Sequence, residues 1–331
     1  MYFESKLRYK WIKQEIESLD PEVDYEKIWR LSASYNLNDF ILNLAYALSI
    51  PSTILPEHSA RPVWREGGGK MLNKATNRVA QTVQFLLILA WYGPKHSKSI
   101  QEVERVNRLH EYWSDKYPGD FSHPEDYIYA VCLFATQKHQ LFVRVGLPGL
   151  SEKEKIAAHH FWKDIYTLLR IPGGKPLDEF PMSWDGMINS IHKIENLYSE
   201  GSENGRLGLE ANYAQLVYRF FPFGFRWLGR RLILALAPPK ILQAYDISPV
   251  HALTGWLIKL FVRLYFLFMI NVLPDPKVGY WELLEKKPES DRRRQRLLRQ
   301  ELDRNFPTFF SRHVEQLGIQ CPFVARPDSK M

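Results

Sequence analysis

Residues 99–117 read Ser99-Ile-Gln-Glu-Val-Glu-Arg-Val-Asn-Arg-Leu-His-Glu-Tyr-Trp-Ser-Asp-Lys-Tyr117, and they show the periodicity that recurs through most of the chain. Ser99 followed by Glu102 is a capping box, so we predict that a helix starts there. At a spacing of three and four residues, one stripe of this helix contains Ile100, Val103, Val106, Asn107, His110 and Trp113. The segment is therefore predicted to be an amphipathic helix that turns His110 toward its apolar side.

The imidazole of His110 has two interpretations. It can be a core histidine whose ring nitrogens are hydrogen-bonded within the protein. It can also be a ligand for a metal or a haem iron, because imidazole is neutral near pH 7, is a good nitrogen donor and is inexpensive to bury once its second nitrogen has an acceptor. The helix alone favours the core histidine, and the ligand interpretation stays open.

The helical period recurs along the rest of the chain, and no clean two-residue alternation is bounded by hairpin turns. We therefore predict an all-α fold. Two further capping boxes, Ser122 with Glu125 and Ser151 with Glu154, predict helix starts. The prolines and glycines of residues 51–69 predict a loop.

The linkers between the predicted helices are too short to separate domains, and 331 residues can bury a sizeable core without disulfides. We predict a single domain over residues 1–331. It has a peripheral N-terminal segment, residues 1–24, and ends in an arginine-rich helix and tail at about residues 289–331.

The formal net charge of +7 is spread over interleaved acidic and basic residues, so no nucleic-acid partner is expected. Cys132 and Cys321 stand outside any Cys-x-x-Cys pattern, which fits a reducing compartment and excludes a thiolate zinc site. Charged residues occupy the position where a signal peptide would need its apolar core. We expect an intracellular protein, in the cytoplasm or on the cytoplasmic face of a membrane.

Residues 256–272 are nearly long and apolar enough to cross a bilayer, but Lys259 and Arg263 share one face of this predicted helix. A core helix, a membrane-surface helix and a true span all stay open, in that order of preference. Residues 220–236 form a second apolar patch. Peripheral membrane contact through these two segments is therefore one alternative to an ordinary core.

Patterns for protein-held metals and for nucleotides are missing from the sequence. None of the 10 histidines has a glutamate three residues before it, as a ferritin-like di-iron site needs, and there is no His-Glu-x-x-His. Gly67-Gly-Gly-Lys70 resembles a phosphate-binding loop, but Met71 follows it and no apolar strand precedes it, so nucleotide binding is not expected. No Gly-x-Ser-x-Gly elbow occurs, so a serine hydrolase has no support from a motif. A single buried histidine remains, and a haem requires one, together with apolar walls and cations near its propionates.

The predicted helix at about residues 72–91 offers polar groups for such a site. Arg78, Gln81, Thr82 and Phe85 share one stripe of a segment that is otherwise strongly apolar. Buried polar groups need partners, and dioxygen or a propionate would supply one. A network of hydrogen bonds between helices is an equally good account.

Several motifs, in order and spacing, resemble the haem oxygenases of the MpaB type and, more distantly, the latex-clearing rubber oxygenases. They are Arg78-Val-Ala-Gln-Thr82, Arg105-Val-Asn-Arg-Leu-His110, Tyr127-Ile-Tyr-Ala-Val-Cys-Leu-Phe-Ala-Thr-Gln137, Gly149-Leu-Ser-Glu-Lys-Glu and Phe161-Trp-Lys-Asp-Ile. Phe225-Arg-Trp-Leu-Gly-Arg-Arg, Leu234-Ala-Leu-Ala-Pro-Pro and Ile247-Ser-Pro extend the resemblance to about residues 25–275.

This resemblance implies an all-α domain that encloses a buried haem b, with dioxygen as co-substrate and His110 as the axial ligand of the iron. An Arg-x-x-(Lys or Asp)-Thr motif of the family falls on Arg78, Gln81 and Thr82, which would contact dioxygen or orient it. The sequence departs from the motif at Gln81, because glutamine is a poor proton donor or ligand. The remaining cofactor-pocket candidates are Arg78 again, Phe85, Phe134, Thr136 and Gln137.

The implied activity is oxidation by dioxygen, or oxidative cleavage of a C=C bond, in an apolar substrate of isoprenoid-like or other secondary-metabolite type. A haem enzyme with a different outcome, a hydroxylase or dehydrogenase, is the first alternative. A helical membrane-surface or interaction protein without catalytic activity is the second.

Overall fold

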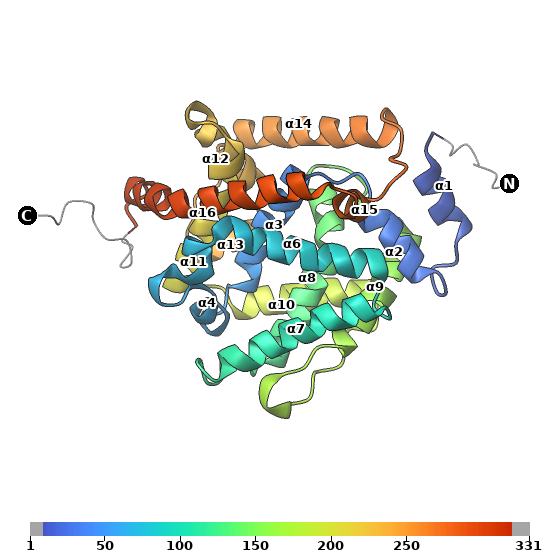
Figure 1. Cartoon of the computed structure of the whole chain (residues 1–331), viewed down its shortest axis with the longest axis horizontal. Coiled ribbons are helices and arrows are strands. Elements are labelled where there is room, and N and C mark those ends of the chain that lie inside the picture. The colour runs from blue at the N-terminus through green and yellow to red at the C-terminus, as the bar shows by residue number, and fades with distance from the viewer. Residues whose placement is uncertain (1–8, 320–331) are drawn as a thin grey trace, which may run out of the picture.

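Helices provide all the regular structure of residues 9–319, which are the residues that this computed structural model describes. No strand occurs among these residues, so the all-α prediction is confirmed. The α-helices are α1 (Trp11–Ser18), α2 (Tyr25–Ala33), α3 (Asp39–Thr53), α4 (Glu57–Trp64), α5 (Gly69–Asn73), α6 (Ala75–Tyr92), α7 (Ser97–Ser114), α8 (Pro124–Arg144), α9 (Glu152–Thr167), α10 (Trp184–Leu197), α11 (Glu203–Phe220), α12 (Arg226–Leu236), α13 (Pro239–Ala244), α14 (Ala252–Asn271), α15 (Tyr280–Glu285) and α16 (Glu289–Gln316) (Figure 1).

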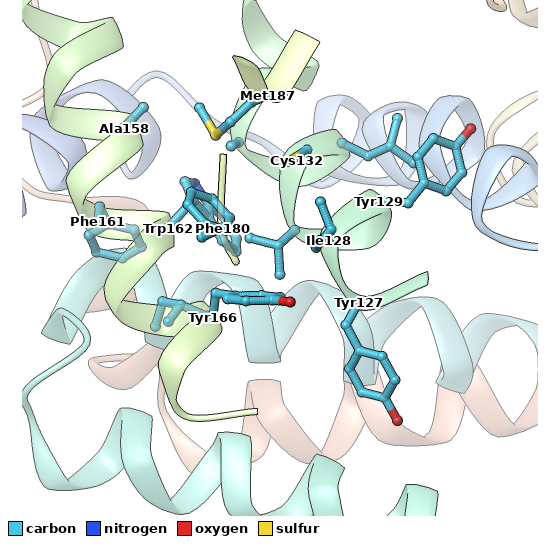
Figure 2. Packing of buried hydrophobic residues seen from close by; sticks show 14 of the residues in the cluster. Tyr127, Ile128, Tyr129, Cys132, Ala158, Phe161, Trp162, Tyr166, Phe180 and Met187 are labelled. Carbon is cyan, nitrogen blue, oxygen red and sulfur yellow. The ribbon is translucent and has the colours of Figure 1, made fainter. Parts of the chain in front are cut away.

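The largest core cluster lies between α8, α9 and α10, and α2, α6 and α7 also contribute residues to it. Figure 2 shows Trp162 and Tyr166 of α9 facing Ile128 and Cys132 of α8. Tyr127, at the start of α8, points away from the centre of this cluster (Figure 2). The start of α8 therefore forms one edge of the core, and this edge faces α7.

Helix α11 passes through the interior, and every residue from Leu207 to Val217 is buried. It packs against α3, α4, α12 and α16. The second half of α16 buries Phe306 and Phe310 against Trp64 and α11, so this helix belongs to the core despite its arginine-rich start. Within the arginine-rich helix and tail predicted at about residues 289–331, the helix spans Glu289–Gln316, and residues 320–331 lie outside the described part of the chain.

Two of the three predicted capping boxes are wrong. Helix α9 does begin with Ser151 and Glu154 in a complete capping box. Helix α7, in contrast, starts at Ser97, and the ring of His96 accepts a hydrogen bond from the backbone N–H of Lys98. Ser99 therefore lies inside the first turn of α7 and does not cap it. Helix α8 starts at Pro124, and the hydroxyl of Ser122 donates to Gly119 O instead of capping the helix.

The predicted loop over residues 51–69 is also wrong, because helix α3 continues through Pro51 and α4 contains Pro62. A proline leaves the carbonyl four residues earlier without its helical partner. For Pro51 this carbonyl is Ala47 O, and the side-chain amide of Asn212 on α11 donates to it at 3.2 Å. A tertiary hydrogen bond therefore compensates for the one that the proline removes.

Helix α14 lies along the surface of the molecule, at the top edge of Figure 1. Among the described residues it is long and apolar enough to cross a membrane, yet few of its residues are buried. Its inner side carries Val262, Ile258 and Phe266, which pack against the cluster around α11 and α12. The core-helix alternative for this segment is therefore wrong, because most of its apolar side chains face outward.

Candidate functional site

Helices α6 and α7 form a hairpin that presents the predicted site residues. A four-residue connection, Gly93 to His96, joins them, and Gly93 adopts φ +84° where a side chain would meet Glu26. In Figure 1 the two helices diverge from this connection. Arg78, near the start of α6, and His110, near the end of α7, therefore both lie toward the diverging ends of the hairpin.

The imidazole of His110 is in apolar surroundings. Its ring lies 5.2 Å from that of Phe121 and 5.8 Å, edge to face, from that of Tyr127. Burial lowers the pKa of His110 to about 4, so the ring is neutral at physiological pH. Its Nδ1 atom is buried and has no hydrogen-bond partner. The structure thus provides a neutral imidazole with an unsatisfied nitrogen, which is costly for a purely structural histidine.

Not every residue of the predicted stripe of α7 faces inward. Val103 and Asn107 are buried and His110 is half-buried, as predicted, but Ile100 is exposed. The buried stripe runs through Ser99 instead, because α7 starts earlier than predicted and Ser99 turns toward the core. The prediction of the inward face is therefore right from Val103 to His110 and wrong at Ile100.

Arg65, Lys70 and Arg78 form a cationic group whose members lie close enough to repel one another. Arg65 contacts α7 one helical turn beyond His110. The guanidinium of Arg65 stacks on the ring of Trp113, with 4.0 Å between Cζ and the ring centroid. The pKa of Arg65 is lowered mainly by burial and then by the charge of Arg78. The pKa of Lys70 is also lowered mainly by burial, and then by the charges of Arg65 and Arg78. None of the ion pairs within residues 9–319 involves these three cations. An anion would be stabilised beside them.

The segment that carries Arg65 and Lys70 has several backbone φ angles in the positive range. Arg65 adopts φ +35°, and the three following glycines, Gly67 to Gly69, all have positive φ values. Arg65 and Lys70 were not predicted as site residues. The glycine run with flanking cations is the sequence signal that points to them.

The predicted residues of α6 differ in their surroundings. Arg78 donates from Nε to the hydroxyl of Tyr46 at 3.0 Å and is only partly buried. Gln81 is exposed and Thr82 is partly exposed, so a ligand can reach both side chains. Phe85 packs against the largest core cluster. The polar part of the stripe is therefore accessible, and its aromatic part faces the core.

The three predicted residues of α8 are engaged elsewhere. Phe134 stacks on Trp162, with 6.3 Å between ring centroids. Thr136 is fully buried and donates to Cys132 O at 2.8 Å, while the amide of Gln137 donates to Ala45 O of α3. No described contact joins these residues to His110, and their role in a cofactor pocket stays a prediction.

The described residues contain no group of three or more His, Cys, Asp and Glu side chains that could hold a metal ion. Among the predicted site residues, His110 is the one whose chemistry suits a metal.

Comparison with known proteins gives one finding on the family. Residues 44–300, more than three quarters of the chain, match the catalytic domain described as ER-bound oxygenase mpaB/B′/rubber oxygenase. No curated protein matches the chain significantly. The matched segment includes the α6–α7 hairpin, the cationic group and all the site residues predicted from the sequence. The chain belongs to the mpaB/rubber oxygenase family.

Proposed function

We propose that this protein is a haem b-dependent oxygenase that uses dioxygen to oxidise, or to cleave at a C=C bond, an apolar substrate of isoprenoid-like or other secondary-metabolite type. The observation that carries the proposal is the neutral, half-buried imidazole of His110 with its unpartnered Nδ1. It lies within the segment that matches the catalytic domain of an oxygenase family.

The residues around His110 fit a haem. A haem needs one axial nitrogen donor, apolar contacts for the porphyrin and cations for its propionates. His110 can supply the nitrogen and is held neutral by burial, while Phe121 and Tyr127 supply apolar surface beside it. The cationic group, defined as Arg65, Lys70 and Arg78, supplies positive charge without carboxylate partners.

Haem, when bound, supplies an iron that activates dioxygen. The role of His110 would be to hold the cofactor and tune its iron. Arg78, Gln81 and Thr82 would donate hydrogen bonds that orient dioxygen, and all three side chains are at least partly accessible. The amide of Gln81 can donate a hydrogen bond but does not exchange a proton near neutral pH, so its role would be orientation.

Gln81 also favours a second candidate function. The resemblance places a lysine or an aspartate where this chain has glutamine, and both of those residues can take part in proton transfer. A haem hydroxylase or dehydrogenase is therefore the alternative. Cleavage of an alkene by dioxygen puts one oxygen atom into each carbonyl product and needs no external electrons. Hydroxylation puts one oxygen into the product and releases the other as water, at the expense of two electrons and two protons.

The absorption spectrum of the protein purified from haem-replete cells tests the cofactor. We expect a Soret band, and we expect His110→Ala to lose most of its haem while keeping the far-ultraviolet circular dichroism of the parent. His160→Ala is the matched control, because His160 is paired with Glu22 at the surface. A parent protein without a Soret band would contradict the proposal and favour the non-catalytic alternative. Unchanged haem in His110→Ala would exclude His110 as the ligand.

The products identify the reaction. Prenylated and other alkene-containing candidates would be incubated with the reduced holoprotein under ¹⁸O-labelled dioxygen and analysed by mass spectrometry. Two carbonyl fragments with one label each indicate cleavage, and one labelled hydroxyl indicates hydroxylation. An oxidised product without label indicates dehydrogenation.

A further inference from the structure

The outward face of α14 is apolar along its whole length. Six exposed apolar side chains follow one helical stripe that contains no charged residue: Leu253, Leu257, Phe261, Leu264, Phe268 and Val272. Arg263 is also exposed but lies off this stripe. Phe261 is 72% exposed. Water-facing helices normally carry their polar residues on this side, so the amphipathic pattern is inverted. An exposed apolar stripe of this size indicates a surface that is covered by something else in the cell.

A second apolar group continues this face beyond the start of α14. Phe223, which is 86% exposed, Phe225 and Trp227 project from the segment that leads into α12. Helices α12 and α14 are in contact, and both lie at the top edge of Figure 1. A cavity of about 390 Å³ between them is lined by Trp227 and Arg231 on one side and Thr254 on the other. The two groups thus belong to one surface, here called the α12–α14 face.

Charge indicates what covers the α12–α14 face. Between residues 220 and 272 the acidic residue is Asp246. Of the basic residues, Arg230 is neutralised by the buried carboxylate of Glu210, which leaves Arg226, Arg231, Lys240, Lys259 and Arg263. Two such faces from two copies of the chain would bring like charges together, which disfavours self-association. A negatively charged bilayer surface is complementary to both the apolar stripe and the flanking cations.

The position of the cations fits a helix that lies in the bilayer surface. Lys259 and Arg263 are on the side of α14 away from the apolar stripe, and Arg263 reaches Gly146 at the end of α8. Long basic side chains in this position can extend to lipid head groups while the apolar stripe enters the acyl region. Trp227, Trp256 and Tyr265 are exposed near the boundary, where aromatic rings with a polar atom are favoured.

The packing of α14 argues against a membrane span. Its inner side chains Val262 and Phe266 pack on the core, and the ring of Phe266 lies 4.9 Å from that of Phe142 on α8. A spanning helix would have to leave these contacts and carry Lys259 and Arg263 into the hydrocarbon region. We propose that the α12–α14 face is a monotopic binding site for an anionic lipid bilayer, with α14 lying parallel to the membrane surface. This proposal does not depend on the presence of haem.

Co-flotation of the full chain with lipid vesicles tests the proposal. We expect binding to phosphatidylcholine vesicles that contain phosphatidylserine, and weaker binding at high salt and without the anionic lipid. Phe261→Asp with Phe268→Asp should weaken binding by about tenfold or more, because charge enters the apolar stripe. Met182→Asp with Leu197→Asp is the matched control, since both side chains are exposed and apolar but lie on other segments. The control pair should bind as the parent does.

Four results would overturn the proposal. The first is a parent protein that stays with the soluble fraction in all vesicle mixtures. The second is equal binding by the Phe261 and Phe268 double variant with an unchanged melting temperature. The third is a parent protein that resists extraction from vesicles by alkaline carbonate, which would indicate a span. If light scattering shows a dimer that the double variant abolishes while vesicles bind neither protein, the face is an interface between copies and the proposal is wrong.

Discussion

Asn107 on α7 is hydrogen-bonded to the backbone of Arg170, whose N–H donates to Asn107 Oδ1 at 3.1 Å. The amide of the same side chain donates to Leu168 O at 2.9 Å. These two bonds attach α7 to the segment that follows α9. They lie one helical turn before His110, so they help to fix the position of its imidazole.

Replacement of Asn107 by leucine should destabilise the protein. The change keeps the approximate volume but leaves Leu168 O and the Arg170 N–H without partners, which we expect to cost about 1–3 kcal/mol. The melting temperature should then fall by roughly 1–5 °C for a chain of this length. Asn204→Leu is the control, because Asn204 bonds Glu57 at the surface and its loss should change stability by less than about 0.5 kcal/mol. Equal melting temperatures for Asn107→Leu and the parent would contradict the structural role.

Glu210 should make stability depend on pH in acid. Burial by itself raises the pKa of this carboxyl, but the hydrogen bonds and charges of Arg230 and His313 outweigh it and lower the pKa to about 2. The guanidinium of Arg230 is bidentate, with N–O distances of 2.6 and 2.9 Å. Because the folded-state pKa is below the unfolded value, the contribution is complete above about pH 4.5 and is lost as the pH falls toward 2. Its size is on the order of 3 kcal/mol.

Urea denaturation of the parent and of Glu210→Gln between pH 3 and pH 7 measures this contribution. At neutral pH the variant should be less stable by about 3–5 kcal/mol, because Arg230 stays charged without its partner. The difference between the two proteins should shrink as the pH falls below about 4.5. Adding Arg230→Met to Glu210→Gln should recover part of the loss. Parallel stability profiles over this pH range would show that the Glu210–Arg230 pair does not set the acid sensitivity.

Gly149 should not tolerate a side chain. It adopts φ +80°, and a Cβ atom there would overlap Nδ1 of His139. The ring of His139 cannot easily move away, because Nδ1 accepts a hydrogen bond from the Leu150 N–H at 3.1 Å. We expect Gly149→Ala to cost about 2–4 kcal/mol through backbone strain and overlap together.

Gly119→Ala separates these two effects. Gly119 has φ +91°, but a Cβ atom there would have open space around it. Only the backbone cost of about 1–2 kcal/mol should remain, so the free energy of unfolding should fall less than in Gly149→Ala. Equal losses in the two variants would mean that contact with His139 contributes nothing.

The all-α class and most helix positions could be predicted because they depend on local periodicity. Helix starts were less predictable, since several polar residues near one terminus compete to cap it. At α7 the ring of His96 takes this role before Ser99 can, and at α8 the fixed φ of Pro124 sets the first turn. At Pro51 a tertiary bond from Asn212 overrides a local breaker. His96 and Pro124 are local residues that compete with the predicted caps, whereas Asn212 is distant in the sequence and acts only through the tertiary structure.

The candidate site shows the same division. The spacing of apolar residues in α7 predicted that His110 faces inward, and in the structure its side chain is half-buried. A glycine run with flanking cations marks the segment of Arg65 and Lys70 in the sequence, but only packing brings Arg65 onto Trp113 at the end of α7. For α14 the composition is apolar on nearly all sides, and only the packing of Val262 against the core tells which face remains exposed.

Lys70→Met should have opposite effects on folding and on haem binding. Burial and the charges of Arg65 and Arg78 already lower the pKa of Lys70, which means that its positive charge is unfavourable in the protein without an anion. Removal of this charge should leave the haem-free protein as stable as the parent or more stable. If the cationic group holds the propionates, the same change should speed the loss of haem to an acceptor protein several-fold. Lys193→Met, an exposed lysine on α10, should alter neither quantity. A Lys70→Met variant that loses stability without haem would show that the Lys70 charge is favourable in the protein. A variant that retains haem as the parent does would place the propionates elsewhere, and it would not bear on the role of His110.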